Sequence, residues 1–190
     1  MTPTNPARVE QVTFSGSQGH LLAARLDLPA GPPRAFALFA HCFTCGKDLR
    51  SAGRVASALT DSGFAVMRFD FTGLGASDGE FANTNFSSNT ADVVAAIEWL
   101  RAEHAAPQIL VGHSLGGAAV LSVAGDVPEV RAVVTVGAPA DTDHVTGLFE
   151  ESSDEIVARG EACVRLAGRP FTIKQQFLDD LSQHRIAERV

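Results

Sequence analysis

The fold is decided by a ten-residue stretch in the middle of the chain, Gln108-Ile109-Leu110-Val111-Gly112-His113-Ser114-Leu115-Gly116-Gly117. It opens with a short apolar run typical of a buried strand, and residues 117–125 have the small side chains of a closely packed helix. The pattern Gly-x-Ser-x-Gly lies between the two. A sharp strand-to-helix turn with a serine at its apex is the context in which such a serine acts as a nucleophile.

Two glycines of this pattern have a steric role. Gly112 and Gly116 carry no Cβ, so the strand and the helix can approach closely around Ser114. The helix that begins there directs free N–H groups and the positive end of its dipole at the space above the serine. We interpret Ser114 as the candidate nucleophile. The alternative interpretation is a glycine-rich turn that contains a serine by chance.

The segments on both sides of this stretch repeat a pattern of strands and helices. Residues 9–15 and 20–28 alternate apolar and polar side chains, which predicts an antiparallel hairpin at a sheet edge. Nearly continuous apolar runs predict four buried strands, at residues 35–41, 64–71, 108–113 and 131–137. Helical patterns occupy residues 48–61 and 88–104, and Asp48 is the expected cap of the first helix.

This order of elements indicates an α/β fold, with a mostly parallel sheet, an antiparallel N-terminal hairpin and helices on both faces. The pattern changes after Pro139, where the chain becomes acidic and helical in part. Two short apolar segments around residues 167–169 predict a small hairpin. We therefore expect a core at residues 1–139 and a cap at residues 140–190. The cap should lie over the carboxyl edge of the sheet, where ligands bind in open α/β folds.

Composition and charge restrict the class of protein. The 190 residues suffice for one domain with a sizeable core, and 45% of them are hydrophobic. The net charge is −7 and the 15 lysines and arginines are scattered, so we expect no nucleic-acid partner. No apolar run is long enough to span a membrane, and residues 1–10 lack the apolar core of a signal peptide. Three cysteines without framework spacing also favour a cytoplasmic location.

An acyl-transfer site at Ser114 needs two backbone donors for the negative charge that develops on the attacked carbonyl oxygen. The N–H of the next residue, Leu115, is the first expected donor. The second should come from the loop that follows the strand at residues 35–41, and we assign it to the N–H of Phe43. We predict no cofactor and no metal ion at this site.

Four blocks of the sequence resemble the α/β-hydrolase superfamily. They are His41-Cys42-Phe43-Thr44-Cys45-Gly46-Lys47-Asp48, Arg68-Phe69-Asp70-Phe71-Thr72-Gly73-Leu74-Gly75-Ala76-Ser77-Asp78-Gly79, Phe81-Ala82-Asn83-Thr84-Asn85-Phe86 and Gly112-His113-Ser114-Leu115-Gly116-Gly117. Within this superfamily, the chain resembles over nearly its whole length the hydrolase half of bacterial fusion proteins that carry an OsmC-like domain. The resemblance implies a serine hydrolase that acts on ester or related acyl bonds. Cys42 departs from the wider family, in which a glycine commonly follows the histidine of the oxyanion loop.

A second departure concerns the partners of the serine. In this family the order is serine, then Asp or Glu, then histidine, with the last two on loops after late strands. No segment of the sequence resembles those loops, so we expect a truncated hydrolase that lacks the triad acid and histidine. Asp141 and Asp143 follow the last buried strand and are the candidate acids. His113, His144 and His184 are too poorly placed to be assigned as the base, and we expect the chain alone to be a weak or inactive esterase.

The expected partners are a small ester or acyl substrate, a second copy of the chain and, in the full gene product, a C-terminal OsmC-like domain. Five apolar side chains are candidates for an acyl pocket, and at least half of them are expected to be ordinary core. They are Phe43, Phe81, Phe86, Leu148 and Phe171.

Two alternatives from other functional classes stay open. Cys42-Phe43-Thr44-Cys45 is a C-x-x-C between a strand and a helix, the placement of a thiol redox site, because a helix N-terminus lowers the pKa of a thiol. Zinc is disfavoured, because Cys42, Cys45 and His41 are not joined by a second ligand pair at a usual spacing. The other alternative is a non-catalytic binding module on a degenerate hydrolase fold.

Overall fold

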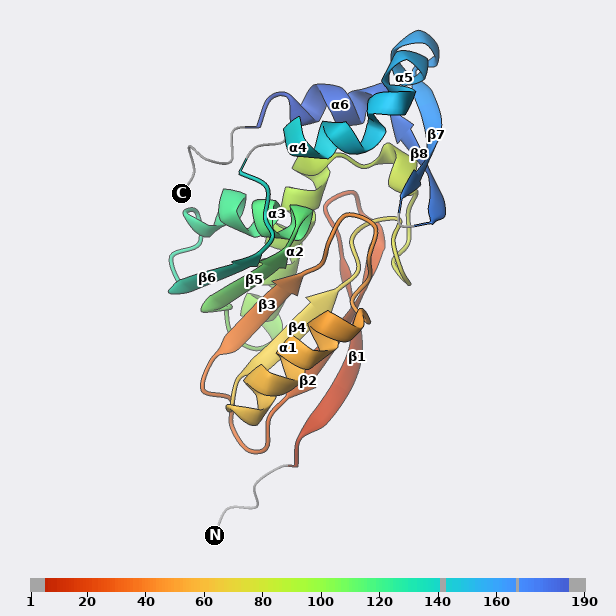
Figure 1. Ribbon diagram of the computed structural model, residues 1–190. Helices are drawn as coiled ribbons and strands as arrows, with labels where there is room; N and C mark the ends of the chain where they lie inside the picture. Colours follow the sequence, from red (N-terminus) through yellow and green to blue (C-terminus); the bar gives the residue numbers. More distant parts are fainter. Residues whose placement is uncertain (1–5, 141–142, 167, 185–190) are drawn as a thin grey trace.

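The computed structural model describes residues 6–140, 143–166 and 168–184. Within them, a six-stranded sheet has the strand order β1-β2-β4-β3-β5-β6 (Figure 1). Its strands are β1 (Arg8–Ser15), β2 (Leu21–Leu28), β3 (Phe36–Ala40), β4 (Ala65–Phe69), β5 (Ile109–His113) and β6 (Ala132–Val136). β1 and β2 form an antiparallel hairpin, whereas β3, β4, β5 and β6 run parallel. The predicted fold class is confirmed.

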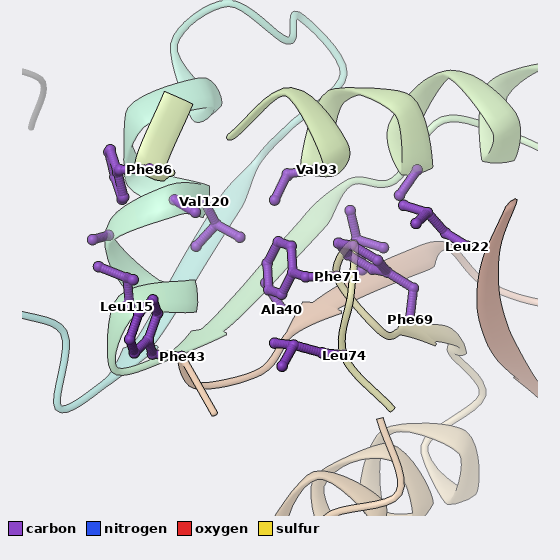
Figure 2. Close-up of a cluster of buried hydrophobic side chains, with 14 of the residues drawn as sticks. Leu22, Ala40, Phe43, Phe69, Phe71, Leu74, Phe86, Val93, Leu115 and Val120 are labelled. Carbon is purple, nitrogen blue, oxygen red and sulfur yellow. The ribbon is translucent and has the colours of Figure 1, made fainter. Parts of the chain in front are cut away.

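Helices cover both faces of this sheet. α1 (Arg50–Asp61) lies on one face, where Ala52 and Ala56 are buried against side chains of the central strands. α2 (Phe86–Glu103) and α3 (Leu115–Ala124) lie on the other face. Figure 2 shows part of the hydrophobic core on the face that α2 and α3 cover. There, Val93 of α2 and Val120 of α3 join Ala40 of β3 in one buried cluster. No helix in the described part of the chain is long and apolar enough to cross a bilayer.

The N-termini of α2 and α1 differ in their capping. α2 begins two residues earlier than predicted because Asn85 caps it: the Asn85 side chain accepts from the Ser88 N–H at 2.8 Å, and Ser88 Oγ accepts from the Asn85 N–H at 2.9 Å. The prediction that Asp48 caps α1 is wrong. Its carboxylate pairs instead with Lys47 Nζ and Arg25 Nη1, both at 3.3 Å, and the N-cap position falls on Leu49.

The chain after β6 forms a small cap. It contains α4 (Asp143–Thr146), η2 (Gly147–Ser152), α5 (Ser153–Arg159), β7 (Glu161–Leu166), β8 (Arg169–Lys174) and α6 (Gln175–Leu181). β7 and β8 pair as the predicted antiparallel hairpin. Figure 1 shows these elements gathered at one end of the molecule, above α2 and α3. Lys174 Nζ donates to Asn83 Oδ1 at 2.6 Å beside η1 (Phe81–Asn83), which helps to hold the cap to the core. The boundary at residue 139 stays a prediction.

β6 differs from the buried strand that the sequence predicted. Val134 and Val136 are 49% and 52% exposed. Among the described residues, β6 is the edge of the sheet and pairs with β5 alone. A parallel strand is normally covered on both faces, which is why its sequence is apolar. The exposed valines of β6 therefore lie where the described chain supplies no covering element.

A buried carboxylate connects the N-terminal hairpin to the sheet. Asp92 of α2 is fully buried and accepts four hydrogen bonds. Two come from the N–H and hydroxyl of Ser17, at 3.0 and 2.7 Å, in the turn between β1 and β2. Two come from the N–H and hydroxyl of Thr72, at 3.0 and 2.8 Å, after β4. One side chain thus joins three segments that are far apart in the sequence.

Replacing this carboxylate by an amide should destabilise the fold. Asp92→Asn keeps the size of the side chain but turns one acceptor into a donor that faces existing donors. We expect it to lower the free energy of unfolding by about 2–4 kcal/mol, measured by urea denaturation. Glu103→Gln, an exposed position on the same helix, is the control and should change it by less than about 0.5 kcal/mol. Equal effects of the two changes would contradict this role of Asp92.

Candidate active site

Ser114 lies between β5 and α3 at the carboxyl end of the parallel strands. Its φ is 54° and its ψ is −126°, and no other non-glycine residue in the described part of the chain has a positive φ. Such a backbone conformation costs about 1–3 kcal/mol and persists only where the surrounding structure fixes it. Here the Ser114 N–H donates to the carbonyl of Val136 at 2.9 Å, and the Ser114 carbonyl accepts from Gly117 at 2.8 Å.

The glycines around Ser114 are required by close approaches of the backbone. A Cβ on Gly112 would lie 2.4 Å from the Cα of Gly117, where β5 meets α3. A Cβ on Gly116 would lie 2.3 Å from the carbonyl oxygen of His41. The predicted steric role of Gly112 is therefore confirmed, whereas Gly116 is required by the end of β3 and not by the strand that precedes Ser114. In addition, the first turn of α3 packs directly on the loop that leaves β3.

This packing places the two residues predicted to carry the oxyanion donors, Leu115 and Phe43, at the lining of one small cavity. Leu115 is the first residue of α3, so its N–H has no acceptor within the helix. The Phe43 N–H lies in the loop after β3 and has no backbone acceptor among the described residues. Phe43 and Leu115 line one small cavity of about 10 Å³, together with His41 and Phe71. Figure 2 shows the Phe43 ring next to Leu115.

Asp70 fixes the loop that contains Phe43. Its carboxylate is buried and accepts from the N–H of Lys47 at 2.6 Å, from Lys47 Nζ at 2.7 Å and from the N–H of Ala76 at 2.9 Å. Burial of the Lys47 ammonium opposes its charge, but the hydrogen bond and charge of Asp70, together with Asp48, outweigh this and raise the pKa of Lys47. A Cβ on Gly75 would lie 2.2 Å from Asp70 Oδ2, so the turn after β4 closes on the carboxylate.

His41, at the base of the same loop, is neutral. Burial lowers the pKa of its ring, against the opposing effects of the Cys42 carbonyl and of Asp70. Nδ1 lies 2.7 Å from the Cys42 carbonyl oxygen, which can only accept, so Nδ1 carries the proton. Nε2 is 3.8 Å from Asp70 Oδ1, and because the ring is neutral this contact is not an ion pair. His41 is thus a positioning residue of the loop.

The two cysteines of the loop form a disulfide, with their Cα atoms 5.3 Å apart. The sequence did not indicate that His113, the residue before Ser114, lies beside them. The ligand atoms of Cys42, Cys45 and His113 are all within 4.8 Å of one another. The signal that could have shown this is the parallel register, because Ala40 pairs with Gly112 and both loops start one or two residues later.

Among the residues whose side chains the structure describes, no catalytic base is found at Ser114. No hydrogen bond to its hydroxyl is found among the described residues. His184 Nε2 lies 2.9 Å from Ser87 Oγ, and Ser87 Oγ donates to Asp180 Oδ1 at 2.5 Å. Asp141 lies outside the described residues. Asp143 and His144 are in α4, but the description of the chain does not extend to their side chains.

The candidates for an acyl pocket divide into two groups. Phe86, the first residue of α2, is fully buried, and its ring lies edge-on to that of His184 with the centroids 4.8 Å apart. Phe43 instead packs against aromatic rings from η1 and the cap, with ring centroids 5.1 Å from Phe81, 5.0 Å from Phe177 and 6.0 Å from Phe149. Phe171 of β8 lies against Phe81 at 5.0 Å. The side chain of Leu148 lies outside the part of the chain that the structure describes. Aromatic rings of the cap therefore contact the loop that contains the second expected donor.

Known proteins match this chain in sequence and in fold. Residues 31–161 match the family described as serine aminopeptidase, S33. The esterase domain of a Rhodothermus marinus protein, known from its crystal structure, is 49% identical in sequence to this chain and superposes with a TM-score of 0.73. The match covers 96% of this chain and 71% of the chain in that structure.

Two curated proteins match a shorter region. The mitochondrial palmitoyl-protein thioesterase ABHD10 of Rattus norvegicus is 38% identical over 103 residues, which are 52% of this chain and 33% of that protein. An uncharacterized 31.7 kDa protein of Escherichia coli, from the traX-finO intergenic region, is 37% identical over 101 residues, 51% of this chain and 35% of that protein. The matches therefore span about a third of the length of these curated relatives.

The contact of Gly116 with the loop after β3 predicts a position-specific effect of alanine. Gly116→Ala places a methyl group against the His41 carbonyl and should lower the free energy of unfolding by about 1–3 kcal/mol. Gly125→Ala, at the other end of α3, meets nothing within 4 Å and has a φ of −68°. It should be neutral or stabilise by up to about 1 kcal/mol. Thermal unfolding of both variants checks this, and equal costs would contradict the close approach.

The lowered pKa of His41 predicts loss of stability in acid. In the unfolded chain the ring takes up a proton below its ordinary pKa of 6.5, whereas the folded protein keeps it neutral to lower pH. Stability from this source is therefore complete above pH 6.5 and falls below it, by up to about 1.4 kcal/mol per pH unit. In urea unfolding between pH 5 and 8, His41→Asn should show a shallower decline than the wild type. The exposed His20→Asn should keep the wild-type decline; a wild-type decline in His41→Asn would contradict the assignment.

Proposed function

The chain belongs to the serine aminopeptidase S33 family of α/β-hydrolases, and from this we propose that Ser114 is the nucleophile of an acyl hydrolase. The observation that carries the proposal is the strained backbone of Ser114 at the junction of β5 and α3. Strain of this kind is concentrated at functional sites, because folding alone selects against it. The family match supports hydrolase chemistry, and the strain singles out Ser114 as the residue to which we assign it.

In the proposed reaction, Ser114 Oγ attacks the acyl carbon of the substrate and gives up its proton to a base. The carbonyl oxygen becomes an oxyanion, which the N–H groups of Leu115 and Phe43 stabilise by donating hydrogen bonds. The leaving group departs with a proton, and water then releases the acyl group from the serine. The fixed loop after β3 supports this role of Phe43, because a donor stabilises the oxyanion best when it needs no rearrangement.

We propose an ester or thioester as the substrate class. The family description names an aminopeptidase, but the relative that covers 96% of this chain at 49% identity is an esterase domain. The rat relative is named as a palmitoyl-protein thioesterase. Oxygen and sulfur esters are attacked by the same serine chemistry, which makes them the substrates best supported by both relatives. The ring cluster of Phe43, Phe81 and Phe177 would offer an apolar acyl chain its first contacts.

We further propose that the base is supplied by polypeptide that covers β6. The apolar β6 has an open edge in the described part of the chain, and the Ser114 N–H is bonded to its last residue, Val136. A strand added at this edge would end beside Ser114. Asp141 and Asp143, which follow β6, stay the candidate acids. The cytoplasmic location, the dimer and the OsmC-like domain also stay predictions.

Hydrolysis of p-nitrophenyl acetate tests both parts of this proposal. In the full-length gene product, Ser114→Ala should lower kcat/KM at least about 10³-fold, because the nucleophile is lost. Ser122→Ala, which removes a hydroxyl bonded to Ala118 on the same helix, is the control and should change it less than about twofold. The 190-residue chain alone should be at least about 100-fold slower than the full-length protein.

The two parts of the proposal would fail in different ways. Robust turnover by the 190-residue chain that vanishes in Ser114→Ala would contradict the external base but keep the nucleophile. Unchanged turnover by Ser114→Ala would contradict the nucleophile. A folded full-length protein without any activity toward esters or thioesters would instead favour the non-catalytic binding module.

A further inference from the structure

Three metal-ligating side chains from two loops lie together at the carboxyl edge of the sheet. Cys42 and Cys45 come from the loop after β3, and His113 is the last residue of β5. Their ligand atoms are all within 4.8 Å of one another, and all three residues are half-buried. The parallel pairing of Ala40 with Gly112 fixes the two loops next to each other. The pairing of β3 with β5 therefore fixes the relative positions of the three side chains.

The histidine of this cluster has a ring nitrogen that the protein leaves unpaired. His113 Nδ1 is buried and has no hydrogen-bond partner among the described residues. A buried polar atom without a partner costs about 1–3 kcal/mol, so its presence needs a reason. Ligation of a cation would use one ring nitrogen and set the orientation of the ring. Because Cys42, Cys45 and His113 are each only half-buried, the cluster is not sealed from solvent.

We propose that the dithiol form of this chain binds one soft divalent ion, Zn²⁺, through Cys42, Cys45 and His113. Two thiolates and one imidazole are a common zinc donor set, and a site with three protein ligands keeps a fourth position for water or another ligand. Thiolates favour zinc over magnesium or calcium, which prefer oxygen ligands. The site goes beyond the proposed function, because no step of acyl transfer uses these three side chains.

The oxidation state of the cysteine pair decides whether the site exists. As a disulfide, the two sulfur atoms are bonded to each other and offer no thiolate. A phosphine reductant breaks the S–S bond: two electrons from phosphorus and two protons from the medium give two thiols, and water supplies the oxygen of the phosphine oxide. Zinc then displaces the two thiol protons. The Cα separation of 5.3 Å suits the disulfide and leaves the sulfur atoms close enough to share one ion.

Zinc titration of the reduced chain tests the site. The protein is reduced with a phosphine, freed of reductant without air and titrated with Zn²⁺ against a chromophoric chelator. We expect one ion per wild-type chain, and no binding by the disulfide form. His113→Ala and Cys45→Ser should each weaken binding at least about tenfold. Cys163→Ser is the matched control, because Cys163 is an exposed thiol outside the cluster, and it should bind like the wild type.

Several results would overturn the proposal. They are equal zinc binding by the reduced and disulfide forms, full affinity in His113→Ala, and loss of binding in Cys163→Ser. Circular dichroism shows whether each variant is folded, and Cys45→Ser keeps the test valid if His113→Ala does not fold. Ser114→Ala should bind zinc like the wild type, so this test and the esterase test succeed or fail separately.

Discussion

The structure depends on the contact between the first turn of α3 and the end of β3. Gly116 has no room for a Cβ, which would lie 2.3 Å from the His41 carbonyl oxygen. Because the helix starts this close to the strand, Leu115 and Phe43 line one small cavity. Hydrogen bonds from the Ser114 N–H to Val136 and from the Gly117 N–H to Ser114 hold the serine in a backbone conformation that it does not adopt unaided. The geometry around the proposed nucleophile is therefore a consequence of helix-to-strand packing.

The loop after β3 receives support from two sides. On the side of the core, the buried carboxylate of Asp70 accepts hydrogen bonds from the backbone and ammonium of Lys47 and from the N–H of Ala76. On the side of the cap, the rings of Phe149 and Phe177 pack against Phe43. Both contacts restrict the movement of this loop, which is what the proposed role of Phe43 as an oxyanion donor requires. They also make the loop the point where the core and the cap meet.

Local features of the sequence predicted the strands, most of the helices and the steric role of Gly112, because periodicity and the absence of a Cβ act on near neighbours. Features that depend on pairing between distant segments were not predicted. Asp48 bonds Arg25, 23 residues away, instead of capping α1. His113 meets the two cysteines through the register of β3 and β5. The exposure of β6 depends on what covers its edge, which an apolar pattern cannot show.

The central claim is that the strained serine between β5 and α3 is the nucleophile. The most direct measurement is labelling of the protein with a fluorophosphonate, followed by proteolysis and mass spectrometry of the peptides. The account predicts a single adduct on Ser114, because phosphonylation requires an activated hydroxyl. An adduct on another serine, such as Ser87 beside His184 and Asp180, would contradict the account. A folded protein that the fluorophosphonate does not label at Ser114 would also contradict it.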